Sequence, residues 1–155
     1  MITVRCARMD DHDAILAMLG RVAQFSRYTE GKRLNRRHLE ATLTRMMQMP
    51  NAGFLIAEYE GQPVGLFVLM LSEDLLSGVR LASEVCWWVD REARAHFAGL
   101  RGRLGVGLRL LEAGEAWAKA HRVHTLQMLA PEPRFHRLFE RRGYLARQLV
   151  FERRF

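Results

Sequence analysis

The chain has 155 residues, 49% of them hydrophobic, so it is long enough to bury one core and shows no compositional sign of disorder. Its formal charge of +7 invites a polyanion as partner. The basic residues, however, are scattered from Arg5 to Arg154, which favours a small anionic ligand over nucleic acid. The N-terminal segment is too charged for a signal peptide, and no apolar stretch approaches membrane-spanning length. We therefore predict one cytoplasmic domain over residues 1–155, with no membrane partner.

The two cysteines, Cys6 and Cys86, have neither the spacing of metal ligands nor that of a disulfide framework. Both fall in predicted strands, so we expect two buried thiols. The six histidines show no ligand spacing either, and the sequence therefore predicts no metal site.

Two helices are predicted after a short first strand over residues 2–7. Asp10 can cap the first helix, whose apolar residues recur at helical spacing until about Phe25. Residues 26–31 are typical of a loop. Asn35 can then cap the second helix, which Pro50 ends.

Three strands follow, and the first two form a predicted hairpin. Residues 54–59 and 64–71 are apolar and aromatic, and the turn-forming residues 60–63 join them. After a loop, the strand over residues 84–90 carries two adjacent tryptophans. Their side chains point to opposite faces of the sheet, so we expect one in the core and the other in the wall of a cleft.

The last third of the chain is predicted to hold two helices and two strands. A long loop over residues 91–104 precedes a helix that begins at a glycine pair and ends near Ala120. Residues 123–130 form a strand, Pro133 starts a second helix that Gly143 ends, and residues 144–155 form a closing strand. The order is strand, two helices, three strands, helix, strand, helix and strand, which predicts a mixed α/β fold.

The glycine pair, Gly105 and Gly107, lies downstream of a strand at the head of a helix. The start of a helix leaves backbone N–H groups unpaired and carries the positive end of the helix dipole, and glycines let a pyrophosphate approach the backbone. Arg101, Arg103 and Arg109 add positive charge around this turn. Such a short pattern also recurs at ordinary helix starts, so a purely structural turn is the alternative.

Three stretches together resemble the GNAT superfamily of acetyl-CoA-dependent N-acetyltransferases. They are the strand ending Trp-Trp-Val-Asp90, the helix headed by Gly107, and Leu138-Phe-Glu-Arg-Arg-Gly-Tyr144, which is similar to the family's Leu-Tyr-Glu-x-x-Gly-Phe box. The resemblance implies a central, twisted, mostly antiparallel sheet flanked by about four helices. It also implies an enzyme that transfers acetyl from acetyl-CoA to a primary amine, of a small molecule or a protein, by direct attack in a ternary complex.

The loop that would hold the pyrophosphate departs from the family's Gln/Arg-x-x-Gly-x-Gly/Ala pattern. Counting back from Gly105 places Gly102 where the family has Gln or Arg, with Arg101 one residue away. Counting forward from the strand instead selects residues 94–99, with Phe97 in place of the first glycine. We prefer the first register, because a helix from residue 99 would contain three further glycines, each costing about 1 kcal/mol relative to alanine.

The resemblance implies a residue for the general base, but the residue that the family uses as general acid is not present at its usual position. Glu84 is similar in position to a glutamate that some family members use as base, directly or through water, and its apolar neighbours would raise its pKa by desolvation. A strand-end carboxylate in solvent or paired with an arginine is the structural alternative. Phe139 stands where the family box carries tyrosine. Water or another group therefore assists the leaving thiolate, or the chain no longer catalyses.

The expected site comprises one catalytic residue, Glu84, a cofactor set and an acceptor set. The cofactor set is Trp88, Val89, Arg94, Arg101, Gly102, Arg103, Leu104, Gly105, Val106, Gly107, Phe135 and Phe139. The acceptor set is Phe25, Tyr28, Glu73 and Trp87.

Two other functions remain open on the sequence alone. Phe139 and the irregular phosphate loop would suit an acyl-CoA-binding module without activity, whereas the charge alone would suit a nucleic-acid-binding domain. The sequence does not identify the acceptor amine, because Glu73 and Asp74 would suit a cation and Arg33 an anion. The oligomeric state is open as well, a homodimer included.

Overall fold

The computed structural model describes residues 1–25, 33–98, 105–130 and 133–147, and its centre is a five-stranded sheet. The strands are β1 (Ile2–Cys6), β2 (Ala52–Tyr59), β3 (Gln62–Glu73), β4 (Arg80–Val89) and β5 (Thr125–Gln127), which neighbour one another in that order. The pairs from β1 to β4 are antiparallel and the pair β4–β5 is parallel. The prediction of a mostly antiparallel sheet in a mixed α/β fold is therefore confirmed.

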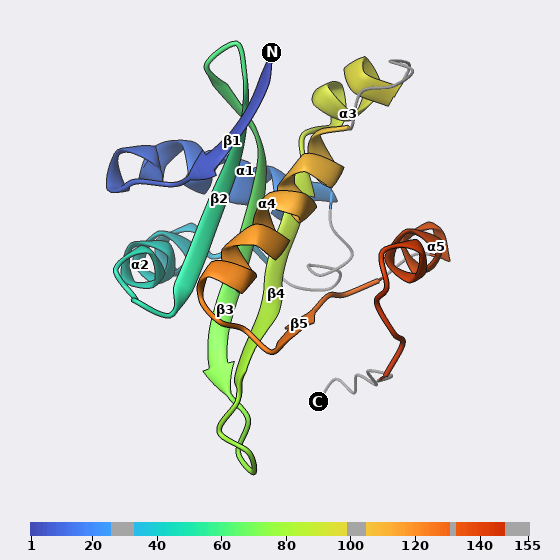
Figure 1. Cartoon of the computed structure of the whole chain (residues 1–155). Helices are drawn as coiled ribbons and strands as arrows, with labels where there is room; N and C mark the ends of the chain where they lie inside the picture. The colour runs from blue at the N-terminus through green and yellow to red at the C-terminus, as the bar shows by residue number, and fades with distance from the viewer. Residues whose placement is uncertain (26–32, 99–104, 131–132, 148–155) are drawn as a thin grey trace.

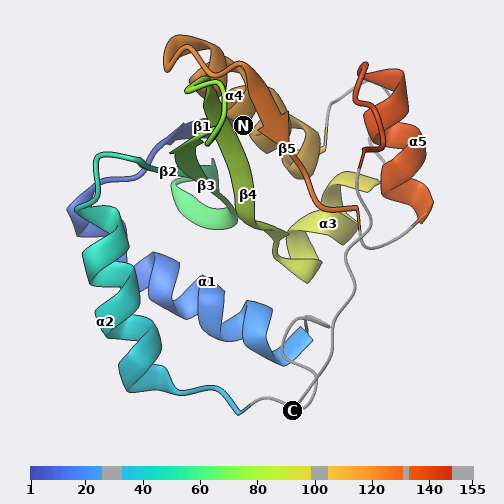
Figure 2. The ribbon, with the colours of Figure 1, turned by 90° about the horizontal axis from the view of Figure 1, so that it is seen from below.

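Helices cover both faces of this sheet. They are α1 (His12–Phe25), α2 (Arg36–Met47), α3 (Arg91–Ala98), α4 (Val106–Ala120) and α5 (Pro133–Arg141), with a short 3-10 turn, Met9–Asp11, before α1. Figure 2 shows α1 and α2 on one face and α4 on the other. The four predicted helices are present. The predicted loop over residues 91–104 was wrong where α3 forms, because its glycine-free first eight residues can hold a helix.

Alternation along β2 and β3 builds one apolar cluster on each face of the sheet. Leu55, Phe67 and Leu69 face α4, where Leu110 and Leu111 meet them. The alternate residues Ile56, Leu66 and Val68 face the other way and pack with Ile15 and Met18 of α1 and Leu43 of α2. The sheet is thus buried on both faces, which fixes its register.

Two glycines let α4 lie close to the sheet. A Cβ atom on Gly53 would come within 2.5 Å of the Trp117 ring, and one on Gly114 would collide with the ring of Phe67. Each missing side chain is replaced by an aromatic ring from the facing element. These glycines are therefore required by packing.

The N-terminal predictions hold for the elements and differ in detail. Asn35 caps α2 as expected, its side-chain oxygen accepting the His38 N–H at 3.0 Å. Asp10 lies inside the 3-10 turn, so it does not cap α1. The hairpin turn is shorter than expected, because Glu60 and Gly61 alone turn the chain, with φ of 52° and 77°.

The C-terminal part agrees less closely with the prediction. The strand expected over residues 123–130 is reduced to the three residues of β5. Gly143 ends α5 with φ of 84°, and the N–H of Tyr144 bonds to the carbonyl of Phe139 at 3.0 Å. Residues 144–147 are not in a strand, and residues 148–155 of the predicted closing strand lie outside the described residues.

Two further expectations concern the thiols and the membrane. Cys86 is partly buried, but Cys6 is exposed, so the expectation of two buried thiols was wrong for Cys6, which ends the edge strand β1. No helix within the described ranges is long and apolar enough to cross a membrane.

Candidate functional site

Strands β4 and β5 separate after three residue pairs, the last of which is Ser83 with Gln127. Figure 1 shows the chain leaving the sheet after β5 toward α5, while β4 continues to α3. From Glu84 to Val89 this edge of β4 has no strand partner among the described residues. Every second residue of a strand in an antiparallel pair directs its N–H and C=O away from that neighbour. The open edge therefore presents backbone donors and acceptors.

Helix α4 begins beside the far end of β4. The indole N–H of Trp87 donates to the carbonyl of Gly107 at 3.2 Å, which ties the helix start to the strand. The first backbone bond inside the helix runs from the Arg109 N–H to the Gly105 carbonyl, and Gly105 provides no side-chain cap. The N–H groups of residues 106–108 therefore have no partner within the helix, and they carry the positive end of its dipole.

Gly105 has no structural reason to be glycine. Its φ is −60°, which any residue can adopt, and a Cβ atom there would meet no heavy atom of the described residues within 4 Å. A Cβ on Gly107 would make ordinary contacts of 3.6 Å with Trp87 and Val89. Within the part of the chain that the structure describes, the helix start thus presents bare backbone at Gly105, which is the arrangement a phosphate group needs.

Glu84 lies where the two strands separate. Leu69 pairs with Glu84 and Val68 with Cys86, so Val85 is the extra residue of a β-bulge. The Glu84 carboxylate accepts the backbone N–H of Leu129 at 2.9 Å, across the gap that opens after β5. Burial raises the pKa of Glu84 from 4.5 to about 7, although the hydrogen bond from Leu129 acts in the opposite direction. This carboxyl is therefore set to exchange a proton near neutral pH.

Aromatic side chains attach α5 to β4. The ring of Trp87 lies 5.6 Å from that of Phe135 and 5.9 Å from that of Phe139, centroid to centroid. Phe139 is only 6% exposed and also contacts Tyr144 at 5.2 Å. The Tyr144 hydroxyl donates to Glu115 at 3.0 Å, so it is engaged with α4. Tyr144 thus packs against the core.

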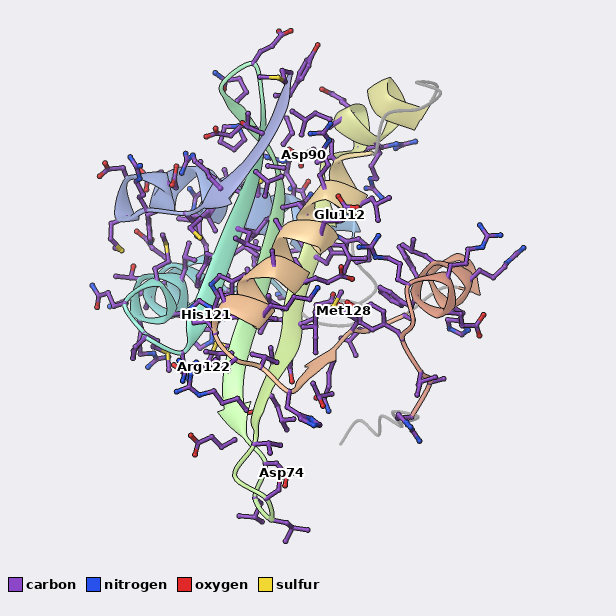
Figure 3. The ribbon with its side chains drawn as sticks, viewed as in Figure 1. Asp74, Asp90, Glu112, His121, Arg122 and Met128 are labelled. Atoms are coloured by element: carbon purple, nitrogen blue, oxygen red, sulfur yellow. The ribbon has the colours of Figure 1, made fainter. Side chains whose placement is uncertain are left out.

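A polar network holds the opposite face of the same strand end. Asp90 follows β4 and binds Arg21 of α1 through two hydrogen bonds of 2.9 and 2.7 Å. It also accepts the indole N–H of Trp88 at 3.0 Å, and the Arg94 guanidinium lies 4.9 Å from the centre of that indole ring. Figure 3 shows Asp90 at the end of β4 near α3. The network fixes α1 to the end of the open edge and keeps Arg94 there.

The sequence matches the model of the acetyltransferase (GNAT) family over residues 21–144. The chain belongs to the GNAT family. No curated protein sequence matches it.

Solved structures share the GNAT fold over the whole chain. A transcriptional regulator from Bacillus halodurans C-125 superposes with a TM-score of 0.77 at 19% identity, covering 100% of both chains. A ribosomal-protein-alanine N-acetyltransferase from Brucella melitensis biovar Abortus 2308 gives 0.72 at 18%, covering 100% of this chain and 99% of the other. Glucosamine-6-phosphate N-acetyltransferase from Arabidopsis thaliana gives 0.74 at 11%, with coverage of 100% and 99%. Likeness at these identities shows the fold alone.

Most described residues expected at the GNAT site gather around the open edge. Glu84, Trp87, Trp88 and Val89 lie on β4, Arg94 on α3, Gly105, Val106 and Gly107 at the start of α4, and Phe135 and Phe139 on α5. The two tryptophans point to opposite faces, as expected: Trp87 packs with Phe139, whereas Trp88 binds Asp90.

Other expected residues lie elsewhere. Glu73 pairs with Arg80 at the far end of β3, four residues beyond Leu69, the residue that pairs with Glu84. The Arg109 side chain points toward β1, where it donates to the Ile2 carbonyl. The predictions for Tyr28, Arg101, Gly102, Arg103 and Leu104, and for the side chain of Phe25, lie outside the described residues.

The ion pair between α1 and the end of β4 was missed by the reasoning from sequence. Arg21 and Asp90 are 69 positions apart, so no local pattern links them. Asp90 alone had a signal, as an acidic residue directly before a helix. Across the described ranges, no three His, Cys, Asp or Glu side chains are grouped as a metal ion would require.

Proposed function

We propose that this GNAT protein transfers the acetyl group of acetyl-CoA to a primary amine, of a small molecule or a protein, by direct attack in a ternary complex. One observation carries the proposal. The uncapped start of α4 and the carboxyl of Glu84 lie along the same unpaired edge of β4. That edge would bind an acetyl donor through its phosphate and amide groups. It would also hold a base beside the thioester, where the amine attacks. We place the reaction in the cytoplasm, where the free thiols of Cys6 and Cys86 are typical.

The residues on this edge fit the donor group by group. The N–H groups of residues 106–108 would bind the pyrophosphate, and Gly105 keeps its approach clear. Arg94, held on the Trp88 ring, adds positive charge nearby. The open backbone of β4 at Trp88 and Val89 would pair with the amides of the pantetheine arm. Acetyl-CoA supplies the acetyl group as a thioester, with the thiol as leaving group.

Glu84 has the properties of the base in this proposal. An alkyl ammonium has a pKa of about 10, so it must lose a proton before it can attack. A carboxyl with a pKa of about 7 is substantially ionised at neutral pH, and it is a stronger base than an ordinary glutamate. The Leu129 N–H fixes one carboxylate oxygen at 2.9 Å and leaves the other to receive the proton.

A second candidate function is acyl-CoA binding without transfer. It is favoured by Phe139, which has no hydroxyl and is buried among Trp87 and Tyr144. The hydroxyl of Tyr144 is bound to Glu115, so it is not offered to the open edge. Both candidates require the same donor site, and they differ in turnover.

A screen of amine acceptors with a free-thiol readout tests the proposal, alongside calorimetric titration with acetyl-CoA. The panel should include a peptide with N-terminal alanine and an amino sugar phosphate, since structural neighbours are named for such acceptors. Acetyl-CoA binding with amine-dependent thiol release is the expected result. Binding with no release for any amine class would favour the inactive module. Heat released with a DNA duplex but not with acetyl-CoA would overturn both.

A further inference from the structure

The connection between β3 and β4 exposes two adjacent leucines. Leu75 is 96% exposed and Leu76 is 95% exposed, in the connection over residues 74–79. Figure 1 shows this hairpin projecting beyond the end of the sheet. Apolar side chains presented together at a projecting tip gain free energy when a partner buries them.

Hydrogen bonds hold this tip in one conformation. The Asp74 carboxylate accepts the N–H of Leu76 at 3.1 Å and both the N–H and hydroxyl of Ser77, at 2.8 and 2.7 Å. The Gly78 N–H bonds to the Asp74 carbonyl at 2.8 Å, and Gly78 has φ of 68°. Figure 3 shows Asp74 in the projecting hairpin. Because the loop is already ordered, docking it costs little conformational entropy.

A cavity that suits such a tip lies at the same end of the sheet. It has a volume of about 280 Å³, and its lining includes Cys6, Arg8, Met9, Met47, Phe54 and Trp117. It lies at the start of β2, where Ala52 pairs with Met70, three residues before β3 ends and the hairpin leaves the sheet. The exposed thioether of Met9 adds apolar surface to its lining.

The charges of the tip and the cavity are complementary. Glu73 and Asp74 stand at the base of the tip and outnumber Arg80, which pairs with Glu73 across the hairpin, so the base is acidic on balance. Hydrogen bonds from Ser77 lower the pKa of Asp74, which keeps it ionised at neutral pH. Arg8 stands in the lining of the cavity. The acidic base of the tip also disfavours an anionic lipid surface as its partner.

We propose that the tip of one copy of this chain inserts Leu75 and Leu76 into the Met9, Phe54 and Trp117 cavity of a second copy. Tip and cavity are at the same end of the sheet, so one two-fold axis brings both contacts together, each copy giving its tip and receiving the other. The product is a closed dimer. This inference does not depend on the proposed acetyl transfer.

The first experiment measures molar mass by light scattering over a wide range of protein concentration. The parent chain should give the mass of two chains. The double variant Leu75→Ser, Leu76→Ser should give the mass of a monomer, because its dimer dissociation constant is raised by about 100-fold or more. Leu145→Ser, at a position 69% exposed elsewhere, is the matched control and should leave the dimer intact. A monomeric mass for the parent chain, or a dimeric mass for the double variant, overturns the proposal.

The second experiment identifies the cavity, using Cys6 as a reporter. In a Leu76→Cys variant, added oxidant should couple the new thiol of one copy to Cys6 of the other, and Cys6→Ser should abolish that disulfide-linked dimer. A disulfide-linked dimer that survives Cys6→Ser overturns the assignment of the cavity. If monomeric protein binds neutral phosphatidylcholine vesicles and the binding requires Leu75 and Leu76, the tip is a lipid-binding surface and the proposed dimer is wrong.

Discussion

Helices α2 and α4 begin in opposite ways. At the start of α2, the Asn35 side chain accepts the His38 N–H at 3.0 Å, so the chain satisfies its own helix end. At the start of α4, Gly105 has extended backbone angles that would accept an Asn or a Ser equally well, but it supplies no cap. A helix start that could be capped at no structural cost, and is not, is available to a ligand.

The two ends of β4 also differ in whether the chain satisfies its own backbone hydrogen-bonding groups. Residues 81–83 pair with strands on both sides, whereas residues 84–89, apart from the bulged Val85, pair with β3 alone among the described residues. Glu84 is the first residue of the open half. The uncapped helix and the unpaired strand edge therefore lie along one side of the molecule, and Arg21 and Asp90 brace it from the other face.

Gly105→Glu should have the largest effect, because it would fill the open helix start with a negative side chain. We expect acetyl-CoA binding to fall below detection in calorimetry, since a carboxylate would occupy the amides and repel the pyrophosphate. The thermal midpoint should stay close to that of the parent, because a Cβ at Gly105 meets no atom of the described residues within 4 Å.

Gly105→Gln is the control that separates size from charge. It should weaken binding less than Gly105→Glu does. An unchanged affinity in both variants would break the comparison between the two helices, and the segment from Arg94 to residue 99 would then be the place to look for the phosphate.

Glu84→Gln should lower turnover by about 10²-fold near neutral pH, with acetyl-CoA affinity nearly unchanged, because it keeps the shape and removes the proton acceptor. The rate of the parent enzyme should rise with pH through an apparent pKa near 7, and the rate of the variant should not show this rise. Steady-state rates from pH 5 to 9 with one acceptor provide the measurement. A variant with the same profile as the parent would leave Glu84 a structural residue.

The same substitution has an opposite effect on stability. Folding raises the pKa of Glu84 from 4.5 to about 7, so the folded state holds this proton more tightly than the unfolded chain does. Below pH 4.5 both states are protonated, and the cost of burying a charge is absent; it grows between pH 4.5 and 7 and is complete above. Glu84→Gln should therefore raise the free energy of unfolding by about 3 kcal/mol at pH 8 and leave it unchanged at pH 4.

A reciprocal exchange of caps tests the helices themselves. Asn35→Ala should lower the free energy of unfolding by about 1 kcal/mol without changing acetyl-CoA affinity. Gly105→Asn should raise it by a few tenths of a kcal/mol and weaken acetyl-CoA binding, because the new side chain competes for the same amides. Denaturant titration and calorimetry on both variants decide the matter. Equal loss of affinity in the two would show that neither helix start is special.

Local patterns were sufficient for the order of the described elements apart from α3, and for the start of α4. Asn35 and Gly143 mark helix ends through their own side-chain or backbone chemistry, and the structure has both at those ends. Alternation in the hairpin placed β2 and β3. The site residues on β4 and α4 follow from the strand and glycine motifs.

Features that depend on distant partners could not be predicted. The point at which β4 separates from β5, after Gln127, depends on how α5 docks through Phe135 and Phe139, which no local spacing encodes. Gly114 looks like a helix-weakening residue in the sequence, yet it is required because Phe67 packs over it. Both outcomes are decided by tertiary contacts.

Phe139→Tyr should have the smallest effect of the set. Its ring lies 5.9 Å from Trp87 and 5.2 Å from Tyr144, on the closed side of the site where α5 is attached. A hydroxyl added there would be in the position that the family box gives to tyrosine, so it offers a proton to the leaving thiolate. We expect turnover to stay within about twofold of the parent, because a thiol is already a good leaving group and its protonation does not limit the rate. A rise approaching 10²-fold would instead show that protonation is limiting. Because Phe139 is 6% exposed, a loss of about 1–3 kcal/mol in unfolding free energy with unchanged turnover would mark an unsatisfied hydroxyl and a packing role. A large loss of acetyl-CoA affinity would contradict the placement of Phe139 on the closed side.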